Sequence, residues 1–336
     1  MLYIRADGNK VIATGHIMRC LSIADAAREK GEDTTFLLAD TEAVALLKER
    51  DYPYLVLGTK WDNMEAELPV LKRLIREKGI KKLFIDSYQV TFRYLEELTK
   101  EVETLYLDDT GSFSYPVSGI ICYATYWRDY YGKPKIAKTV LYMGTDYVPL
   151  RKEFTGLAPK KIKDQVENLL LLSGGTDVYG ILETLLEGIK KDNYKRIDVI
   201  CGSYDTNYEN LCRKYRNFEQ IRIHRGVTQM RKYMEAADIA VTAGGSTLYE
   251  LCAVGTPAIS YSLADNQLAN VRQFQKDGII EYAGDVRKDD VAEAVRGYLE
   301  LYRKNRPLRE DRARKMQALV DGCGADRIAE ILQKEG

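Results

Sequence analysis

The chain has 336 residues, of which 50 are basic and 50 acidic, so its formal net charge is zero. This length usually exceeds one hydrophobic core, and we expect two domains, 1–150 and 151–336, with a linker near 148–163. The balanced charge disfavours a nucleic-acid partner and a polybasic membrane-docking surface. No apolar run approaches the ~20 residues that cross a bilayer, and the chain starts with a strand pattern, so we expect a cytoplasmic protein without stable membrane insertion.

The first half alternates short apolar segments with segments that carry apolar residues at helical spacing. Strands are predicted at 2–5, 35–38, 54–57, 82–85, 104–107 and 119–122. Helices are predicted at 15–30, 42–50, 63–78 and 92–100. Between residues 123 and 163 the periodicity lapses, and we place the linker at the end of this stretch.

The alternation then restarts with a strand at 167–172 and a helix at 178–190. Further strands are predicted at 197–200, 220–223, 239–241, 258–260 and 279–282, and residues 288–334 carry a helical pattern. Alternating strands and helices predict an α/β protein with two Rossmann-like domains, whose parallel sheets face a central cleft. In such folds the helical tail can pack back across the cleft. The six cysteines have no CxxC spacing and mostly lie in apolar runs, so we expect reduced core residues.

The first strand leads into residues 5–21, RADGNKVIATGHIMRCL, which place one of only two histidines, His16, at a glycine-rich turn entering a helix. The carboxyl edge of an open α/β sheet is where such folds bind ligands. His16 is therefore a candidate catalytic residue, although an imidazole at a helix start can also just bond to its own loop. Arg5 and Asp7, near the end of the same strand, could orient the ring or bind substrate hydroxyls.

Polar residues also follow two other predicted strands of the first half. They are Asp86, Ser87 and Tyr88 after one strand, and Asp108 and Asp109 after another. Polar side chains at several strand ends on one edge indicate a pocket, but isolated aspartates there often only form turns.

The second concentrated motif, residues 237–270, runs strand, glycine turn, helix, strand, polar turn and helix. Gly244 and Gly245 allow a ligand to approach the backbone, so that a phosphate can rest on the following helix N-terminus. Ser246 or Thr247 can cap that helix or donate to the phosphate. Glu250 lies one turn further on, where it could reach ribose hydroxyls or be a solvated first-turn carboxylate. Asn266 and Gln267 open the next helix and strengthen the functional interpretation.

A second glycine turn, SGGTD at residues 173–177, follows the first strand of the second half and contains Gly174 and Gly175. Neither glycine turn matches GxxxxGK[ST], and no GxGxxG follows a strand, which disfavours a P-loop NTPase or a dinucleotide dehydrogenase. No cluster of metal ligands is apparent, and we expect neither a metal nor a cofactor.

Seven motifs, in this order, resemble those of the PseG/SpsG family. They are RADGN, TGHxMRC, FIDSY, LDDTG, SGGTD, AGGSTLYE and ADNQLAN. The resemblance spans both halves and implies the GT-B fold; the second half alone is also similar to MurG-like glycosyltransferases. The best-studied activity of the family is hydrolysis of UDP-2,4-diacetamido-2,4,6-trideoxy-β-L-altropyranose in pseudaminic acid biosynthesis. Spore-coat polysaccharide proteins form its other named branch.

The resemblance also implies roles for individual residues. His16 matches the catalytic base. Tyr88 and Asn266 match residues placed beside the substrate sugar, and we also expect Arg5, Asp7 and Gly15 there. The diphosphate loop is matched by Gly244, Gly245, Ser246 and Thr247, the ribose-binding carboxylate by Glu250, and the segment that holds uracil by the main chain around Arg225 to Val227. We also expect Gly174, Gly175 and Gln267 to bind UDP. The sequence departs from the family at Ser87, where characterised members tend to have histidine.

This assignment predicts a metal-independent hydrolase. Because UDP is a good leaving group, the protein needs only to hold the diphosphate, stabilise an oxocarbenium-like carbon and activate a water. Imidazole ordinarily exchanges protons near neutral pH, and attack by one water predicts inversion at the anomeric carbon. Two alternatives remain: a MurG-like glycosyltransferase that uses a UDP-sugar, and a non-enzymatic nucleotide-sugar-binding protein of spore or surface polysaccharide assembly.

Overall fold

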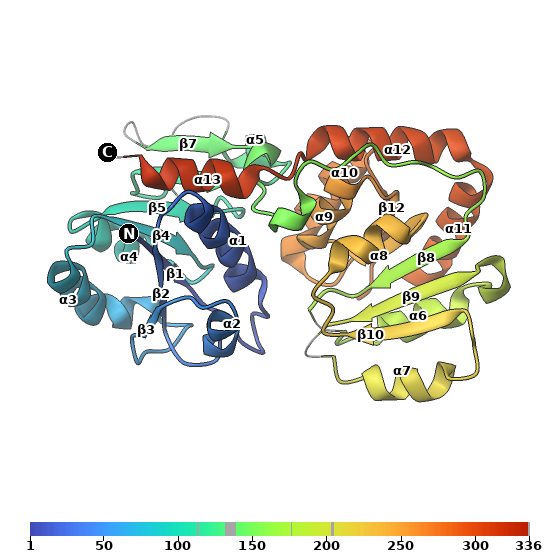
Figure 1. Ribbon diagram of the computed structural model, residues 1–336, viewed down its shortest axis with the longest axis horizontal. Coiled ribbons are helices and arrows are strands. Elements are labelled where there is room, and N and C mark those ends of the chain that lie inside the picture. Colours follow the sequence, from blue (N-terminus) through green and yellow to red (C-terminus); the bar gives the residue numbers. More distant parts are fainter. Residues whose placement is uncertain (113, 132–138, 176, 203–204, 335–336) are drawn as a thin grey trace. The chain divides into compact units, whose positions relative to one another are not determined.

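The computed structural model describes residues 1–112, 114–131, 139–175, 177–202 and 205–334. It divides into two compact units, each built on its own parallel sheet (Figure 1). Unit 1 comprises Met1–Lys152 and Gly322–Gly336, and unit 2 comprises Glu153–Asp321. The predicted α/β class is confirmed. The expected second domain runs to residue 336, whereas the structure assigns the last helix to unit 1.

Unit 1 contains a seven-stranded parallel sheet in the order β3-β2-β1-β4-β5-β6-β7. Its strands are β1 (Leu2–Ala6), β2 (Thr34–Leu38), β3 (Tyr54–Val56), β4 (Lys82–Asp86), β5 (Glu103–Leu107), β6 (Gly119–Cys122) and β7 (Val140–Met143). Its helices are α1 (Gly15–Glu29), α2 (Val44–Glu49), α3 (Leu68–Lys78), α4 (Phe92–Thr99), α5 (Trp127–Tyr131) and α13 (Gly324–Gln333), with a 3₁₀ turn η1 at Met64–Glu67.

The strand order of unit 1 reverses between β1 and β4, which lie side by side with Ala6 opposite Asp86. Such a reversal is where open α/β sheets bind their ligands. Alternation along the strands separates two faces. Tyr3 and Ile85 pack in one core cluster with residues of α3 and α4, so the neighbouring Asp86 points to the opposite face.

Two elements of unit 1, β7 and α5, fall in the stretch 123–163 that lacks a clear sequence pattern. β7 is an edge strand, and its four residues Val140 to Met143 are exposed or only half-buried. Its four residues, VLYM, are apolar, but so short a run in a stretch without periodicity does not by itself indicate a strand.

Helix α13 lies against α1 in unit 1 (Figure 1). Lys30 at the end of α1 forms a 2.9 Å ion pair with Glu330, and Arg327 donates to the carbonyl of Asp146. Gly324 lets the helix start directly against the chain at Val148, because a Cβ there would collide with that backbone. These contacts explain why the C-terminal segment belongs to unit 1.

Unit 2 contains a six-stranded parallel sheet in the order β10-β9-β8-β11-β12-β13. Its strands are β8 (Asn168–Leu172), β9 (Arg196–Cys201), β10 (Ile221–Arg225), β11 (Ile239–Ala243), β12 (Ala258–Ser262) and β13 (Glu281–Asp285). Its helices are α6 (Ile181–Gly188), α7 (Tyr208–Tyr215), α8 (Met230–Ala236), α9 (Thr247–Val254), α10 (Asp265–Lys276), α11 (Val291–Lys304) and α12 (Arg306–Leu319). The strand order reverses between β8 and β11, the strands that precede the two glycine turns.

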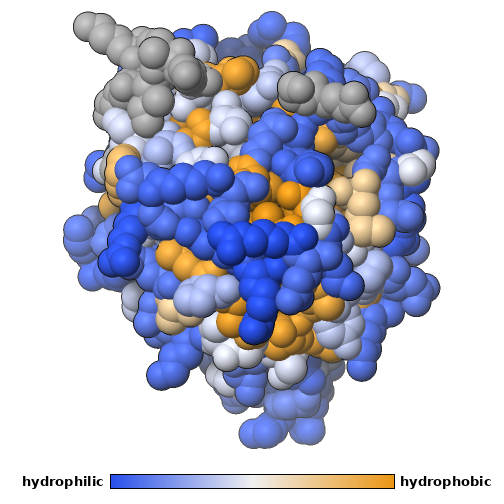
Figure 2. All heavy atoms as spheres, turned by 90° about the vertical axis from the view of Figure 1, so that its left-hand side faces the viewer, coloured by the Kyte–Doolittle hydropathy of each residue, from blue (hydrophilic) through white to orange (hydrophobic). Residues whose placement is uncertain are grey.

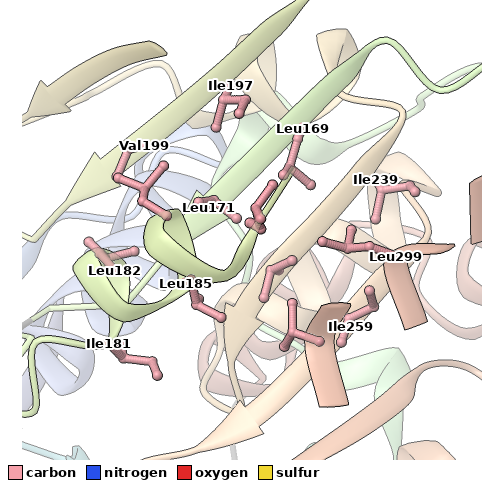
Figure 3. Packing of buried hydrophobic residues seen from close by; sticks show 14 of the residues in the cluster. Leu169, Leu171, Ile181, Leu182, Leu185, Ile197, Val199, Ile239, Ile259 and Leu299 are labelled. Atoms are coloured by element: carbon pink, nitrogen blue, oxygen red, sulfur yellow. The ribbon is translucent and has the colours of Figure 1, made fainter. Parts of the chain in front are cut away.

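The core of unit 2 forms between one face of its sheet and the helices α6 and α11 (Figure 3). Alternate residues such as Leu169, Leu171 and Val199 point from the strands toward Leu185 of α6 and Leu299 of α11. Burial of these side chains removes apolar surface from water, which stabilises the fold by about 25 cal/mol per Å². This packed layer fixes the strands whose carboxyl ends carry the glycine turns.

The face shown in Figure 2 is mostly hydrophilic, and its hydrophobic patches are separated by polar side chains. Among the described helices, none combines the length and apolar character needed to span a membrane. None of the six cysteines, all of which lie among the described residues, forms a disulfide. Four are buried as predicted, whereas Cys212 and Cys323 are only half-buried.

Candidate functional sites

The turn between β1 and α1 is held by its own side chains. Asn9 Oδ1 accepts the backbone N–H groups of Val11 at 2.8 Å and Ile12 at 3.0 Å, and Asn9 pairs with Ala13 in an isolated bridge. A Cβ on Gly8 would lie 2.9 Å from a side-chain atom of Ile17, so the turn needs glycine there. This local structure starts α1 at Gly15, which is exposed and has no atoms within 4 Å of where its Cβ would lie.

His16 is buried and is bonded through one ring nitrogen. Its Nδ1 lies 2.7 Å from Oδ1 of Asp86, the last residue of β4. Among the described residues, no hydrogen bond involves its Nε2. The interpretation of His16 as a mere loop contact therefore does not match this geometry, because the ring bonds to the neighbouring strand across the switch point.

Arg19, one turn further along α1, binds the same carboxylate. Its Nε lies 2.5 Å from Asp86 Oδ2, its Nη2 lies 2.5 Å from Oδ1, and its Nη1 donates to the Tyr123 hydroxyl at 2.7 Å. Burial alone would raise the pKa of Asp86, but the charges of Arg19 and His16 outweigh it and hold this pKa well below its usual range. Asp86 is therefore an ionised, fixed acceptor beside the imidazole.

Tyr88 forms the neighbouring wall of this site. Its ring meets His16 edge-on, with centroids 4.6 Å apart, and the residue remains 39% exposed. Its hydroxyl donates to Asp109 Oδ2 at 3.0 Å, and Arg19 lies 3.5 Å from the same oxygen. Burial raises the pKa of the Asp109 carboxyl, against the opposing charge of Arg19. Ser87 is buried, and its hydroxyl accepts the N–H of Gln89.

Arg5 and Asp7 do not join His16 in this site. Arg5 is fully buried and donates to both oxygens of Glu67, at 2.8 and 2.7 Å, and to Asp7 at 2.5 Å. Tyr94 of α4 completes this cluster through Glu67. Arg5 shares a sheet face with Tyr3, which packs toward α3 and α4. The side chains of Arg5 and Asp7 thus belong to a buried ion-pair network, and their contact with sugar stays a prediction.

The two aspartates after β5 have different surroundings. Asp108 is buried and accepts from Thr110, Gly111 and Tyr115, so it shapes its own loop. Only Asp109 reaches the site, through Tyr88. Asp108 is thus a turn-forming aspartate, whereas Asp109 belongs to the group of polar side chains at the strand ends.

In unit 2, β11 ends in the turn that leads to α9. A Cβ on Gly244 would collide with Val271 and lie 3.3 Å from Gln267, so α10 can pack closely here only against glycine. Asn270 strengthens the contact by donating to the Gly244 carbonyl at 3.3 Å and accepting from Tyr249 at 2.7 Å. These bonds fix the start of α9.

The start of α9 presents backbone donors. Gly245 has no atoms within 4 Å of where its Cβ would lie, and Ser246 is exposed. Ser246 is the N-cap but makes no side-chain capping bond. Within the described part of the chain, no acceptor is bonded to the N–H groups of Gly245, Ser246 and Thr247. Free amides at a helix N-terminus are suited to an anion.

The turn after β8 carries exposed Gly174 and Gly175, and it lies against the end of β9. A Cβ on Gly202 would collide with the carbonyls of both glycines. Asp177 is committed to the next helix, because its carboxylate accepts the N–H groups of Ile181 and Leu182. Thr176 of this motif lies outside the described residues.

The remaining predicted site residues are Arg225, Val227, Glu250 and Gln267, expected to bind UDP, and Asn266, expected beside the sugar. Arg225 is exposed and lies over the ring of Tyr208, 4.2 Å from its centroid, and Val227 is half-buried two residues on. Asn266 is exposed at the start of α10, whereas Gln267 accepts the N–H of Leu263 at 2.9 Å. Glu250 is half-buried in the first turn of α9. No group of three or more potential metal ligands occurs among the described residues.

Comparisons with known proteins agree with this architecture. Residues 169–320 match the glycosyltransferase family 28 C-terminal domain. The chain is 24% identical, over 98% of its own length and 97% of the relative, to the spore coat polysaccharide biosynthesis protein SpsG of Bacillus subtilis (strain 168). MurG of Acinetobacter baumannii has a similar structure, with a TM-score of 0.71, 14% identity and coverage of 100% of both chains.

A shorter match joins this chain to a named transferase. Over 129 residues, 36% of this chain and 37% of the relative, it is 29% identical to the UDP-N-acetylglucosamine--N-acetylmuramyl-(pentapeptide) pyrophosphoryl-undecaprenol N-acetylglucosamine transferase of Campylobacter jejuni (strain RM1221).

The fold is that of the GT-B class, as the sequence predicts, and the structural neighbours are GT-B glycosyltransferases such as MurG. Within that class, the matches together fit a PseG/SpsG-like family, in agreement with the resemblance of the motifs. The chain is thus related to enzymes that act on nucleotide sugars.

Several residues of the sites were not predicted as such. Arg19 lies three residues after His16 on one helix face, a spacing that could have indicated it. Glu67, the buried partner of Arg5, lies 62 residues away in a short 3₁₀ turn and has no sequence signal. Gly202 follows a predicted strand, but only the structure shows that it lies against the glycine turn.

Proposed function

We propose that this chain hydrolyses a UDP-activated diacetamido-trideoxy sugar, UDP-2,4-diacetamido-2,4,6-trideoxy-β-L-altropyranose, to UDP and free sugar in pseudaminic acid or related surface-polysaccharide biosynthesis. The observation that carries this proposal is the buried His16, with Nδ1 on an ionised carboxylate and Nε2 without a protein partner among the described residues. That arrangement suits a general base. The choice of sugar rests on the sequence motifs.

In the proposed reaction, His16 Nε2 takes a proton from a water molecule as the water oxygen attacks the anomeric carbon. The bond from that carbon to the diphosphate oxygen breaks, and UDP leaves with the electron pair. One displacement by water inverts the anomeric configuration. Tyr88 is proposed to contact the sugar, because it is the exposed ring beside His16.

Unit 2 supports the binding of UDP in this proposal. The free amides at Gly245, Ser246 and Thr247 are suited to the negative charge of a diphosphate, which strengthens as the leaving group departs. Glu250, one turn into the same helix, is proposed to accept from the ribose hydroxyls. These roles require neither a metal nor a cofactor.

A glycosyltransferase is the second candidate, and the family 28 match of residues 169–320 favours it. A transferase would use the same UDP-binding turn, but an acceptor hydroxyl would replace the water. A non-enzymatic nucleotide-sugar-binding protein of spore or surface polysaccharide assembly is the third candidate, in which His16 would have no catalytic role.

Incubating the purified protein with the UDP-sugar, without acceptor and with a metal chelator, separates these candidates. A hydrolase releases UDP and free sugar through many turnovers, and NMR of the first product shows the inverted anomer. Turnover that begins only when an acceptor is added would identify a transferase. Binding without any turnover would support the non-enzymatic role.

Two variants separate base chemistry from UDP binding. We expect His16→Ala to lower turnover by about 100-fold or more, the scale of general-base catalysis, with little change in UDP affinity. Glu250→Ala should instead weaken UDP binding by about tenfold, the scale of a hydrogen bond to a charged group. Steady-state kinetics and calorimetric titration with UDP measure both quantities. Equal loss of UDP binding in the two variants would contradict the catalytic role of His16.

A further inference from the structure

We infer that Asp86, which is hydrogen-bonded to Arg19, positions His16 and fixes the tautomer of its imidazole. The proton is then on Nδ1, and Nε2 is the basic nitrogen. The catalytic consequence rests on the proposed function, but the tautomer does not depend on which reaction occurs. His16 is the proposed catalytic residue, and Asp86 and Arg19 act through it.

Two charged groups lie near Nδ1 of His16. Asp86 Oδ1 is 2.7 Å from Nδ1, and Arg19 Nη2 is 2.9 Å from it. An ionised carboxylate can only accept a hydrogen bond, whereas a guanidinium can only donate one. The two partners therefore favour opposite tautomers. The guanidinium already donates to both oxygens of Asp86, which leaves the carboxylate as the natural partner of an Nδ1–H group.

Both groups that contact Nδ1 of His16 are themselves held in place. Asp86 is fully buried, and Arg19 is anchored at its far side by the Tyr123 hydroxyl. His16 and Arg19 are one helical turn apart on α1, so a single turn brings both to the carboxylate. A fixed partner on one ring nitrogen sets both the tautomer and the orientation of the ring.

The second histidine provides an internal reference. His224 contacts Asp198 through Nε2, at 2.8 Å, and its Nδ1 lies 3.5 Å from the Tyr233 hydroxyl. The same argument assigns the proton of His224 to Nε2. The two histidines of the chain should therefore show opposite tautomers in one spectrum.

The test is a long-range ¹H–¹⁵N correlation spectrum of the full chain labelled with ¹⁵N-histidine. The pH is raised until both rings are neutral, and the signals missing from His16→Gln are assigned to His16. We expect the Nδ1–H pattern for His16 and the Nε2–H pattern for His224. An Nε2–H pattern for His16 in the unaltered protein would overturn the inference without any Asp86 variant.

Asp86→Ala then removes the acceptor and leaves Arg19 as the partner of Nδ1. We expect the His16 proton to move to Nε2, the His224 pattern to remain, and the turnover of UDP release to fall at least about 100-fold with KM changed less than about threefold. Arg19→Lys is the conservative control. It should keep the Nδ1–H pattern and lose less than about tenfold in turnover.

Asp86→Ala leaves a buried cation, so a charge-neutral variant, Asp86→Ala with Arg19→Met, protects the test against failure to fold. Thermal unfolding checks both variants, and the neutral one should also lose the dominant Nδ1–H pattern. A persistent Nδ1–H pattern in either folded variant would overturn the inference. If the tautomers are as expected but no UDP-sugar is hydrolysed, the proposed function fails and the positioning of His16 stands.

Discussion

The β1–α1 turn of unit 1 and the β11–α9 turn of unit 2 occupy equivalent places at the switch points of their sheets, yet they are built differently. Around the first turn, charged side chains bind one another, as Arg19 and His16 do through their hydrogen bonds to Asp86. Around the second, glycines leave backbone N–H groups uncovered. The difference matches the tasks proposed for them, because moving a proton needs a titratable group and holding a diphosphate needs fixed donors.

Charged networks in unit 1 should be costly to break, and Glu67 gives the largest expected effect on stability. Glu67→Gln leaves buried Arg5 with a weakened partner, so the free energy of unfolding should fall by about 3 kcal/mol in urea titrations. Glu65→Gln, on the same 3₁₀ turn but half-exposed, is the control and should cost less than about 1 kcal/mol. Equal losses would mean that burial of the network contributes little.

Neighbouring glycines should separate stability from binding in unit 2. Gly245→Ala has room for its methyl group, so it should fold normally but weaken UDP binding by about tenfold, by covering the free amides. Gly244→Ala collides with buried Val271 and should lower the melting temperature instead. Calorimetric titration and thermal unfolding measure the two effects. Gly297→Ala, at an exposed position of α11, is the control for binding. A similar loss of UDP affinity in this variant would contradict the binding role of the amides at Gly245.

Ser246 provides the smallest expected effect. Because its side chain makes no capping bond, Ser246→Ala should change the free energy of unfolding by less than about 0.5 kcal/mol. Asp290→Ala is the matched control, since Asp290 caps α11 by accepting the N–H of Glu293 at 3.0 Å, and it should cost about 1 kcal/mol. Chemical denaturation of both variants measures the difference. A larger cost for Ser246→Ala than for Asp290→Ala would show that the N-terminus of α9 is capped by its side chain.

Prediction from sequence succeeded best where the signal was local. Hydrophobic periodicity predicted most strands to within a few residues, including β4 and β11, whose ends carry the candidate sites. It missed β7, because the apolar run of this strand, VLYM, is only four residues long and lies in a stretch without periodicity. It also merged the 3₁₀ turn η1 with α3, since both continue one apolar stripe.

The sequence by itself determined the α/β class, the two glycine turns and the rare His16 at the start of a helix, because these depend on neighbouring residues. Only the tertiary structure decided that Asp86 rather than Arg5 or Asp7 holds the imidazole. Alternation along the strands points Arg5 and Asp86 to opposite faces of the sheet. His16 and Asp86 are 70 residues apart in the sequence, and they meet because β1 and β4 lie side by side. Such pairings depend on strand order and register, which no local pattern contains.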